Sequence, residues 1–163
     1  MHAREIESAV SGHEDVNVVD FSPCERYIIS CSHRNEIAVF DRRFMNRPPL
    51  HRLHHADTGE DDLNAGITSA LWWSQGSGTS QSMLMTGGGD GAVKLWDIRR
   101  ATEDAETWSF EANLGPIARL AASPLFEHLI IGGDSGTVSV YTLDHSMISH
   151  YKDHPMTLLS YDN

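Results

Sequence analysis

The chain has 163 residues, of which 40% are hydrophobic and 21% charged, a composition typical of a globular protein with a buried core. Its 12 Lys and Arg against 23 Asp and Glu give a formal net charge of −11, which disfavours binding to nucleic acid and to anionic membranes. The apolar runs are far shorter than the ~20 residues of a transmembrane helix, and the N-terminus lacks the pattern of a secretory signal. The two cysteines, Cys24 and Cys31, cannot form a disulfide framework. We therefore expect an intracellular protein, in the cytoplasm or the nucleus.

Three segments of the chain share one pattern, and aligned positions lie 56 and then 45 residues apart, as Ser30, Thr86 and Ile131 do. In each segment a turn rich in Gly, Ser, Asn or Asp precedes apolar residues that alternate with other residues. Alternation with a period of two predicts a β-strand. A short apolar run before each turn predicts a hairpin in every unit.

Each unit is predicted to contain four short strands. In chain order, the apolar runs predict strands at Val16–Phe21, Tyr27–Ile29, Ile37–Phe40 and His51–Leu53, then Ile67–Trp73, Met83–Met85, Val93–Trp96 and Thr107–Phe110, and finally Ile117–Ala122, Leu129–Ile131, Val138–Tyr141 and Met147–Tyr151. Residues 43–50, the acidic residues 57–62 and the Ser/Gly/Gln-rich residues 74–82 are predicted to be surface loops.

These units resemble the WD-repeat β-propeller family, whose repeat opens with Gly-His and closes with Trp-Asp. The resemblance rests on Gly12-His13, Phe21-Ser22-Pro23 and Phe40-Asp41 in the first unit, and on Asp90-Gly91 and Leu95-Trp96-Asp97 in the second. It implies an all-β fold, an incomplete β-propeller of four-stranded antiparallel blades with about three degenerate repeats.

The repeat frame divides the chain into five parts. They are residues 1–11 as the outer strand of a preceding blade, 12–56 as blade 1, 57–112 as blade 2 with insertions, 113–152 as blade 3 and 153–163 as the start of a truncated blade. Because a blade cannot bury its faces alone, we expect a piece of a longer chain, a truncated gene model or a self-associating piece.

Blades of this family typically contain a buried hydrogen-bonded tetrad of His, Ser or Thr, Asp and Trp. Carried over by column, the resemblance implies tetrad positions at His13 and Ser30 in the first unit and at Thr86, Asp90 and Trp96 in the second. Asn64 occupies the His column of the second unit, and the third unit keeps none of the four residues. No complete tetrad is therefore expected.

Two short motifs are suggestive of catalysis but fall in predicted hairpin turns. Gly133-Asp134-Ser135-Gly136 repeats the nucleophile tetrapeptide of trypsin-like serine proteases, and the glycine-rich residues 87–91 could cradle a phosphate. Turns require these same residue types, so the turn reading is favoured for both. No catalytic residue is assigned, and a hydrolase is kept only as an alternative function.

His51, His54, His55 and Asp57 bring residue types that bind metals into one stretch. The repeat frame places them in an insertion rich in Pro, Arg and acidic residues, which favours a solvated loop over a zinc or copper site. Cys24 and Cys31 lack ligand spacing and are expected to be inert. Neither a metal site nor a cofactor is predicted.

Arginine pairs, Arg42-Arg43 and Arg99-Arg100, follow the ends of the first two units. The simpler interpretation is that they solvate a turn. The other interpretation is a resemblance to WD-repeat substrate receptors of cullin-4 ubiquitin ligases, in which a Trp-Asp-x-Arg ending docks on the ligase adaptor. Trp96-Asp97-Ile98-Arg99 matches this ending, and Phe40-Asp41-Arg42-Arg43 matches except for the aromatic residue. Arg43 and Arg99 are therefore candidate partner-binding residues.

The sequence predicts a non-catalytic scaffold that binds protein partners. A cullin-4 ligase adaptor is one candidate partner, and the remaining blades of a longer chain or a second copy are others. An enzyme is disfavoured because no carboxylate pair and no nucleophile with its base fall in convergent columns.

Overall fold

The computed structural model describes residues 15–55, 66–73, 82–112, 114–123 and 127–143. Several predicted features lie outside these residues: the outer strand in 1–11, the tetrad position His13, the acidic Asp57, the fourth strand of the third unit at Met147–Tyr151 and the partial blade 153–163. Every structural statement below concerns the described part of the chain.

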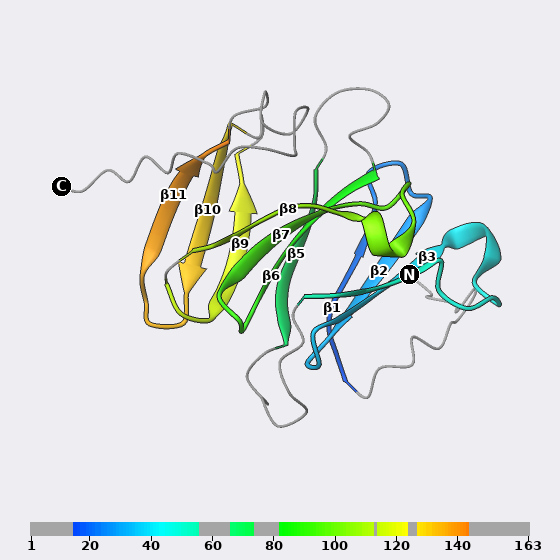
Figure 1. Ribbon diagram of the computed structural model, residues 1–163, viewed down its shortest axis with the longest axis horizontal. Coiled ribbons are helices and arrows are strands. Elements are labelled where there is room, and N and C mark those ends of the chain that lie inside the picture. The colour runs from blue at the N-terminus through cyan, green and yellow to red at the C-terminus, as the bar shows by residue number, and fades with distance from the viewer. Residues whose placement is uncertain (1–14, 56–65, 74–81, 113, 124–126, 144–163) are drawn as a thin grey trace, which may run out of the picture.

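The described strands form three antiparallel sheets, which confirms the all-β prediction (Figure 1). The first sheet contains β1 (Val16–Phe21), β2 (Tyr27–Ser32), β3 (Glu36–Asp41) and β4 (His51–His54). The second sheet contains β5 (Ile67–Trp73), β6 (Met83–Gly88), β7 (Ala92–Asp97) and β8 (Glu106–Glu111). The third sheet contains β9 (Ile117–Ala122), β10 (His128–Gly133) and β11 (Val138–Thr142). Two short 3₁₀ turns, η1 (Arg42–Phe44) and η3 (Thr102–Asp104), follow β3 and β7. No helix in these ranges is long and apolar enough to cross a membrane.

The strands pair with their neighbours in sequence, as expected for consecutive hairpins. The β2–β3, β6–β7 and β10–β11 turns each contain a residue in the left-handed region at the same place in the repeat, namely Asn35 (φ 60°), Gly91 (φ 78°) and Gly136 (φ 84°). Gly and Asn tolerate this conformation best. The turn prediction for both glycine-rich motifs is thus confirmed.

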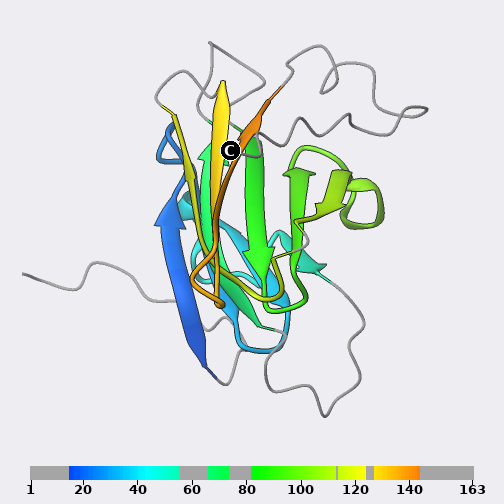
Figure 2. The same ribbon diagram turned by 90° about the vertical axis from the view of Figure 1, so that its left-hand side faces the viewer.

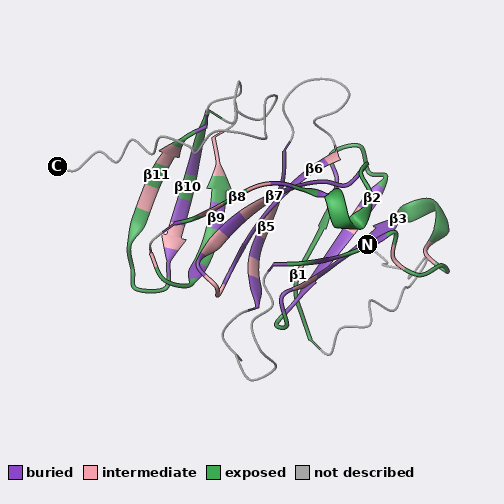
Figure 3. Cartoon of the chain, in the orientation of Figure 1, coloured by how far each residue is buried: buried purple, intermediate pink, exposed green. Residues whose placement is uncertain are grey.

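The second sheet lies between the other two, because β5 contacts both β1 and β9. Figure 1 shows the three sheets side by side, and Figure 2 views the third sheet with the others behind it. The buried residues are concentrated on the second sheet and on β2 and β3, whereas β1 and β11 contain no buried residue (Figure 3). Successive residues of a strand point to opposite faces, so β6 and β7 supply side chains to both contacts.

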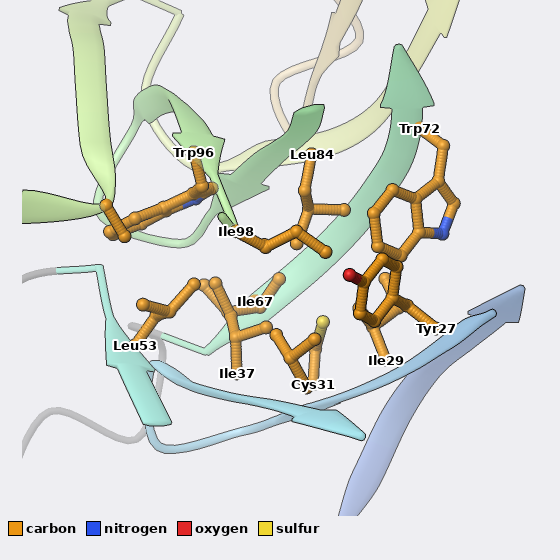
Figure 4. Packing of buried hydrophobic residues seen from close by; sticks show 12 residues of the cluster. Tyr27, Ile29, Cys31, Ile37, Leu53, Ile67, Trp72, Leu84, Trp96 and Ile98 are labelled. Atoms are coloured by element: carbon orange, nitrogen blue, oxygen red, sulfur yellow. The ribbon is translucent and has the colours of Figure 1, made fainter. Parts of the chain in front are cut away.

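Two hydrophobic clusters fill these contacts. Between the first and second sheets, side chains such as Ile29, Ile37 and Leu53 pack against Leu84, Trp96 and Ile98 from the opposite side (Figure 4). Between the second and third sheets, Met85 and Leu95 pack with Ile117, Leu129 and Ile131. The outward face of the third sheet differs, since Ile130, Val138 and Val140 are exposed there.

One glycine is required by the close approach of the first two sheets. A Cβ atom at Gly66 would lie 2.5 Å from the Cα atom of His33, in the β2–β3 turn. Because the obstructing atoms belong to the backbone, they cannot move aside as a flexible side chain would. Gly66 therefore lets the chain enter β5 directly against the preceding hairpin.

Leu84→Ala should lower the free energy of unfolding by about 3 kcal/mol, because Leu84 is fully buried between two sheets and its removal leaves a cavity. The matched control is Val19→Ala on β1, where the side chain is 67% exposed and the expected change is below about 0.5 kcal/mol. Chemical denaturation measures both. Equal small losses would contradict the packing of the two sheets.

Candidate docking site

A buried hydrogen-bond network centred on Thr86 organises the second sheet. The indole N–H of Trp96 donates to the Thr86 hydroxyl at 2.8 Å, and the same hydroxyl lies 3.0 Å from Nε2 of His55. Nδ1 of His55 lies 2.7 Å from the Asp90 carboxylate. One proton arrangement satisfies all four groups: Nδ1–H donates to Asp90 while Nε2 accepts from Thr86. The network links the end of the first sheet to β6 and β7.

This network corrects two sequence expectations. The second unit has a complete set of His, Thr, Asp and Trp, whereas the repeat frame gave its His column to Asn64. The histidine is His55, which the insertion after it separates from β5, so an ungapped alignment cannot find it. His55 is also 1% exposed and His51 8%, so these two histidines do not lie in a solvated loop.

The remaining candidate residues lie apart from this network. Ser30 and Phe40 are buried in the first sheet, where the hairpin turn is instead organised by Ser32, whose hydroxyl accepts from the backbone N–H groups of Arg34 and Glu36. Ser135 in the β10–β11 turn is hydrogen-bonded to Thr137, at 3.0 Å between the two hydroxyl oxygens. No cluster of three metal-binding side chains occurs among the described residues. Cys31 is buried, and burial raises the pKa of its thiol to about 12.

His55→Ala should lower the free energy of unfolding by about 2–4 kcal/mol, because it removes one hydrogen bond each from the buried Thr86 hydroxyl and the Asp90 carboxylate and leaves a cavity. His54→Ala is the matched control. The His54 side chain is 53% exposed, and its ion-pair contact, from Nε2 to Glu36, is long at 3.9 Å. That variant should stay within about 0.5 kcal/mol of the parent. Thermal and urea unfolding compare the two, and indistinguishable stabilities would contradict the network.

The two Asp-x-Arg sequences adopt the same conformation on neighbouring sheets. At the end of β3, Asp41 accepts from the backbone N–H of Arg43 at 3.0 Å, from its Nε at 3.0 Å and from its Nη2 at 2.7 Å. At the end of β7, Asp97 accepts from the same three atoms of Arg99, at 3.1, 2.8 and 2.5 Å. Each carboxylate therefore holds its arginine in a fixed bidentate fork.

A second arginine lies near each carboxylate. Nε of Arg26 is 3.5 Å from Asp41, and Nε of Arg100 is 3.6 Å from Asp97. The carboxylate side chains are only 12% and 5% exposed, whereas Arg43 and Arg99 are 58% and 44% exposed. The carboxylates thus face the protein, and the arginines present their remaining N–H groups to solvent.

These contacts shift the pKa values of both carboxyl groups downward. Burial alone would raise the pKa of Asp97, but the hydrogen bonds and positive charge of Arg99 outweigh it and hold that pKa below its usual range. Hydrogen bonds from Arg43 are the main cause of the lowered pKa of Asp41. Arg99 therefore neutralises a buried charge, which the interpretation of the arginine pairs as mere turn solvation did not include.

The two turns lie side by side. Nε2 of His51, at the start of β4, donates to the carbonyl of Ile98 at 2.8 Å, and Nδ1 lies 3.0 Å from the Thr102 hydroxyl. Tyr27 pairs with Asp41 across β2 and β3 and packs in the same cluster as Ile98. The Asp97 hydrogen bond raises the pKa of Arg99, and the Asp41 hydrogen bond raises that of Arg43.

We use the name arginine face for the arginines of the two neighbouring turns together with Arg26, which lies beside Asp41. It comprises Arg26, Arg42, Arg43, Arg47, Arg99 and Arg100, half of the chain's 12 Lys and Arg. Its acidic residues are Asp41 and Asp97, Glu25, which is paired with Arg42, and Glu103 and Asp104 of η3. The arginine face is thus rich in positive charge, whereas the chain as a whole is strongly acidic.

Arg99→Gln should lower the free energy of unfolding by about 1 kcal/mol at pH 7, a small value because the guanidinium is half-exposed and Arg100 remains nearby. A carboxyl group whose pKa is lowered by folding stabilises the fold above its unfolded pKa, and this contribution disappears as pH falls through the lower, folded value. The difference between parent and variant should therefore shrink below about pH 4. Urea unfolding between pH 7 and 2 tests this, with exposed Arg119→Gln as the control that shows no difference at any pH.

The antiparallel sheets, their stacking and the repeated turns are those of a WD-repeat β-propeller. The family model for the WD domain, G-beta repeat, matches residues 4–41 and 58–97, and the chain belongs to this family.

Two comparisons identify similar proteins. Over 94 residues the chain is 32% identical to Rik1-associated factor 1 of Schizosaccharomyces pombe, an alignment covering 53% of this chain and 14% of that protein. A solved structure described as the Dos1 propeller superposes with a TM-score of 0.66 at 28% identity, covering 80% of this chain and 30% of that one. The chain thus spans less than a third of the length of either relative.

Proposed function

We propose that this chain is a non-catalytic protein-interaction module that docks through the arginine face. The observation that supports it is the repetition of one Asp-x-Arg conformation on two adjacent sheets, with both guanidinium groups half-exposed. A turn that merely needed solvation would not require the same three hydrogen bonds twice. Blades at residues 12–56, 57–112 and 113–152, and a structural role for the tetrad positions, belong to the same proposal.

The partner in this proposal is a cullin-4 ligase adaptor, with the chain acting as a substrate receptor. Two features support it: the resemblance of Trp96-Asp97-Ile98-Arg99 to the docking ending of such receptors, and the relative whose name states its association with Rik1. Both Rik1 and the cullin-4 adaptor are therefore suitable test partners. An intracellular location is part of the proposal.

Replacing both docking arginines, Arg43→Gln with Arg99→Gln, should weaken adaptor binding about 30-fold or more, because charge-assisted hydrogen bonds across the interface are lost. Glutamine is preferred to aspartate, since a new carboxylate would repel the buried Asp97. Binding is measured by surface-immobilised adaptor and, in parallel, by immobilised Rik1.

The matched control is Arg119→Gln, which removes an exposed arginine from the third sheet. It should leave adaptor affinity unchanged. Melting temperatures of all three proteins separate lost docking from lost folding. A parent that binds neither partner, or a double variant that binds as well as the parent, would overturn the proposed function.

A further inference from the structure

The loop between β3 and β4 presents an aromatic side chain beside the docking arginines. This loop, residues 42–50, contains no buried residue and is drawn as exposed or intermediate in Figure 3. Phe44 is 43% exposed and Leu50 is 51% exposed. Exposed aromatic and aliphatic side chains next to arginines are characteristic of interface anchors.

Two guanidinium groups hold the Phe44 ring in place. The Cζ atom of Arg47 lies 4.5 Å from the ring centroid and that of Arg43 lies 5.4 Å from it, both within cation–π range. Arg43 is itself fixed by Asp41, and the backbone N–H of Arg47 donates to the Phe44 carbonyl at 2.9 Å. The ring is thus preorganised, which reduces the entropy lost on binding.

We propose that Phe44 is the apolar anchor of the arginine face and that the face takes an acidic protein segment with an aliphatic side chain between its carboxylates. The aliphatic group would pack on Phe44 and Leu50, while the carboxylates would pair with Arg43, Arg47 and Arg99. This inference rests on the proposed docking function and specifies the chemistry of the partner surface.

Charge and geometry favour an acidic protein segment over a nucleic acid. A base could stack on Phe44, but the chain carries a net charge of −11, Glu25 is paired with Arg42, and Glu103 and Asp104 lie in η3, shortly after Arg100 in the sequence. An extended phosphate backbone would be repelled by the negative charge of the surrounding surface. A short acidic protein segment can place its few carboxylates on the arginines alone.

The anchor is tested with Phe44→Ala on the full chain. The partners are the cullin-4 adaptor and a fluorescein-labelled Asp-Glu-Leu-Asp-Glu-Leu peptide, with binding followed by anisotropy. Phe44→Ala should weaken binding to both by about 10- to 30-fold, as truncation of an aromatic anchor does. Val140→Ala is the control, a 55% exposed apolar residue on β11 of the third sheet, and should bind like the parent. Both melting temperatures should match that of the parent.

The outcomes separate this inference from the proposed function. Loss of adaptor binding in the Arg43→Gln/Arg99→Gln variant but not in Phe44→Ala overturns the anchor and leaves the docking function standing. Phe44-dependent peptide binding by a parent that binds no adaptor supports the anchor and overturns the adaptor. Equal binding of a peptide with Ser in place of Leu, or tighter binding of a short oligothymidylate, overturns the proposed partner chemistry.

Discussion

The packing of the second sheet between its two neighbours is the constraint on which the rest of the structure depends. Alternate residues of β6 and β7 point to opposite sides, so Leu84 and Trp96 enter one cluster while Met85 and Leu95 enter the other. Neither face could remain in water without a large hydrophobic cost. The second sheet is therefore stable only with a partner on each side, and this stacking brings the ends of β3 and β7 together.

Buried histidines at the two ends of β4 fix how the first two sheets meet. His51 binds the loop after β7, through the carbonyl of Ile98 and the hydroxyl of Thr102, and His55 binds Thr86 and Asp90 at the other end. Apolar packing alone is non-directional and tolerates small shifts between sheets, whereas these hydrogen bonds do not. The relative position of the two docking turns therefore depends on polar contacts at both ends of β4, with those of His51 next to the turn after β7.

The strands could be predicted from the sequence because apolar residues that alternate with other residues favour strand formation, as in Ile37, Val39 and their equivalents in β7. His55 could not, since an insertion separates it from β5 and moves it out of the ungapped repeat frame. The pairing of Arg99 with Asp97 could not be predicted either, because the Arg99 side chain reaches the carboxylate only once the turn between the two residues has formed. Period-two patterns are local, while both missed contacts depend on the path of the chain between elements.

The arginine face is an arginine-rich docking surface on a chain whose net charge is strongly negative. Each carboxylate uses Nε and Nη2 of its arginine, so two of five guanidinium donors are engaged and the rest remain for a partner. Because the Asp41 and Asp97 carboxylates are nearly buried, they orient the two arginines but are not themselves presented to a partner. A flexible lysine in either position would keep the charge but lose the fixed direction of these donors. Pairing with Asp41 and Asp97 thus fixes the direction of the arginine donors, and the exposed ring of Phe44 adds an apolar side chain beside Arg43 and Arg47.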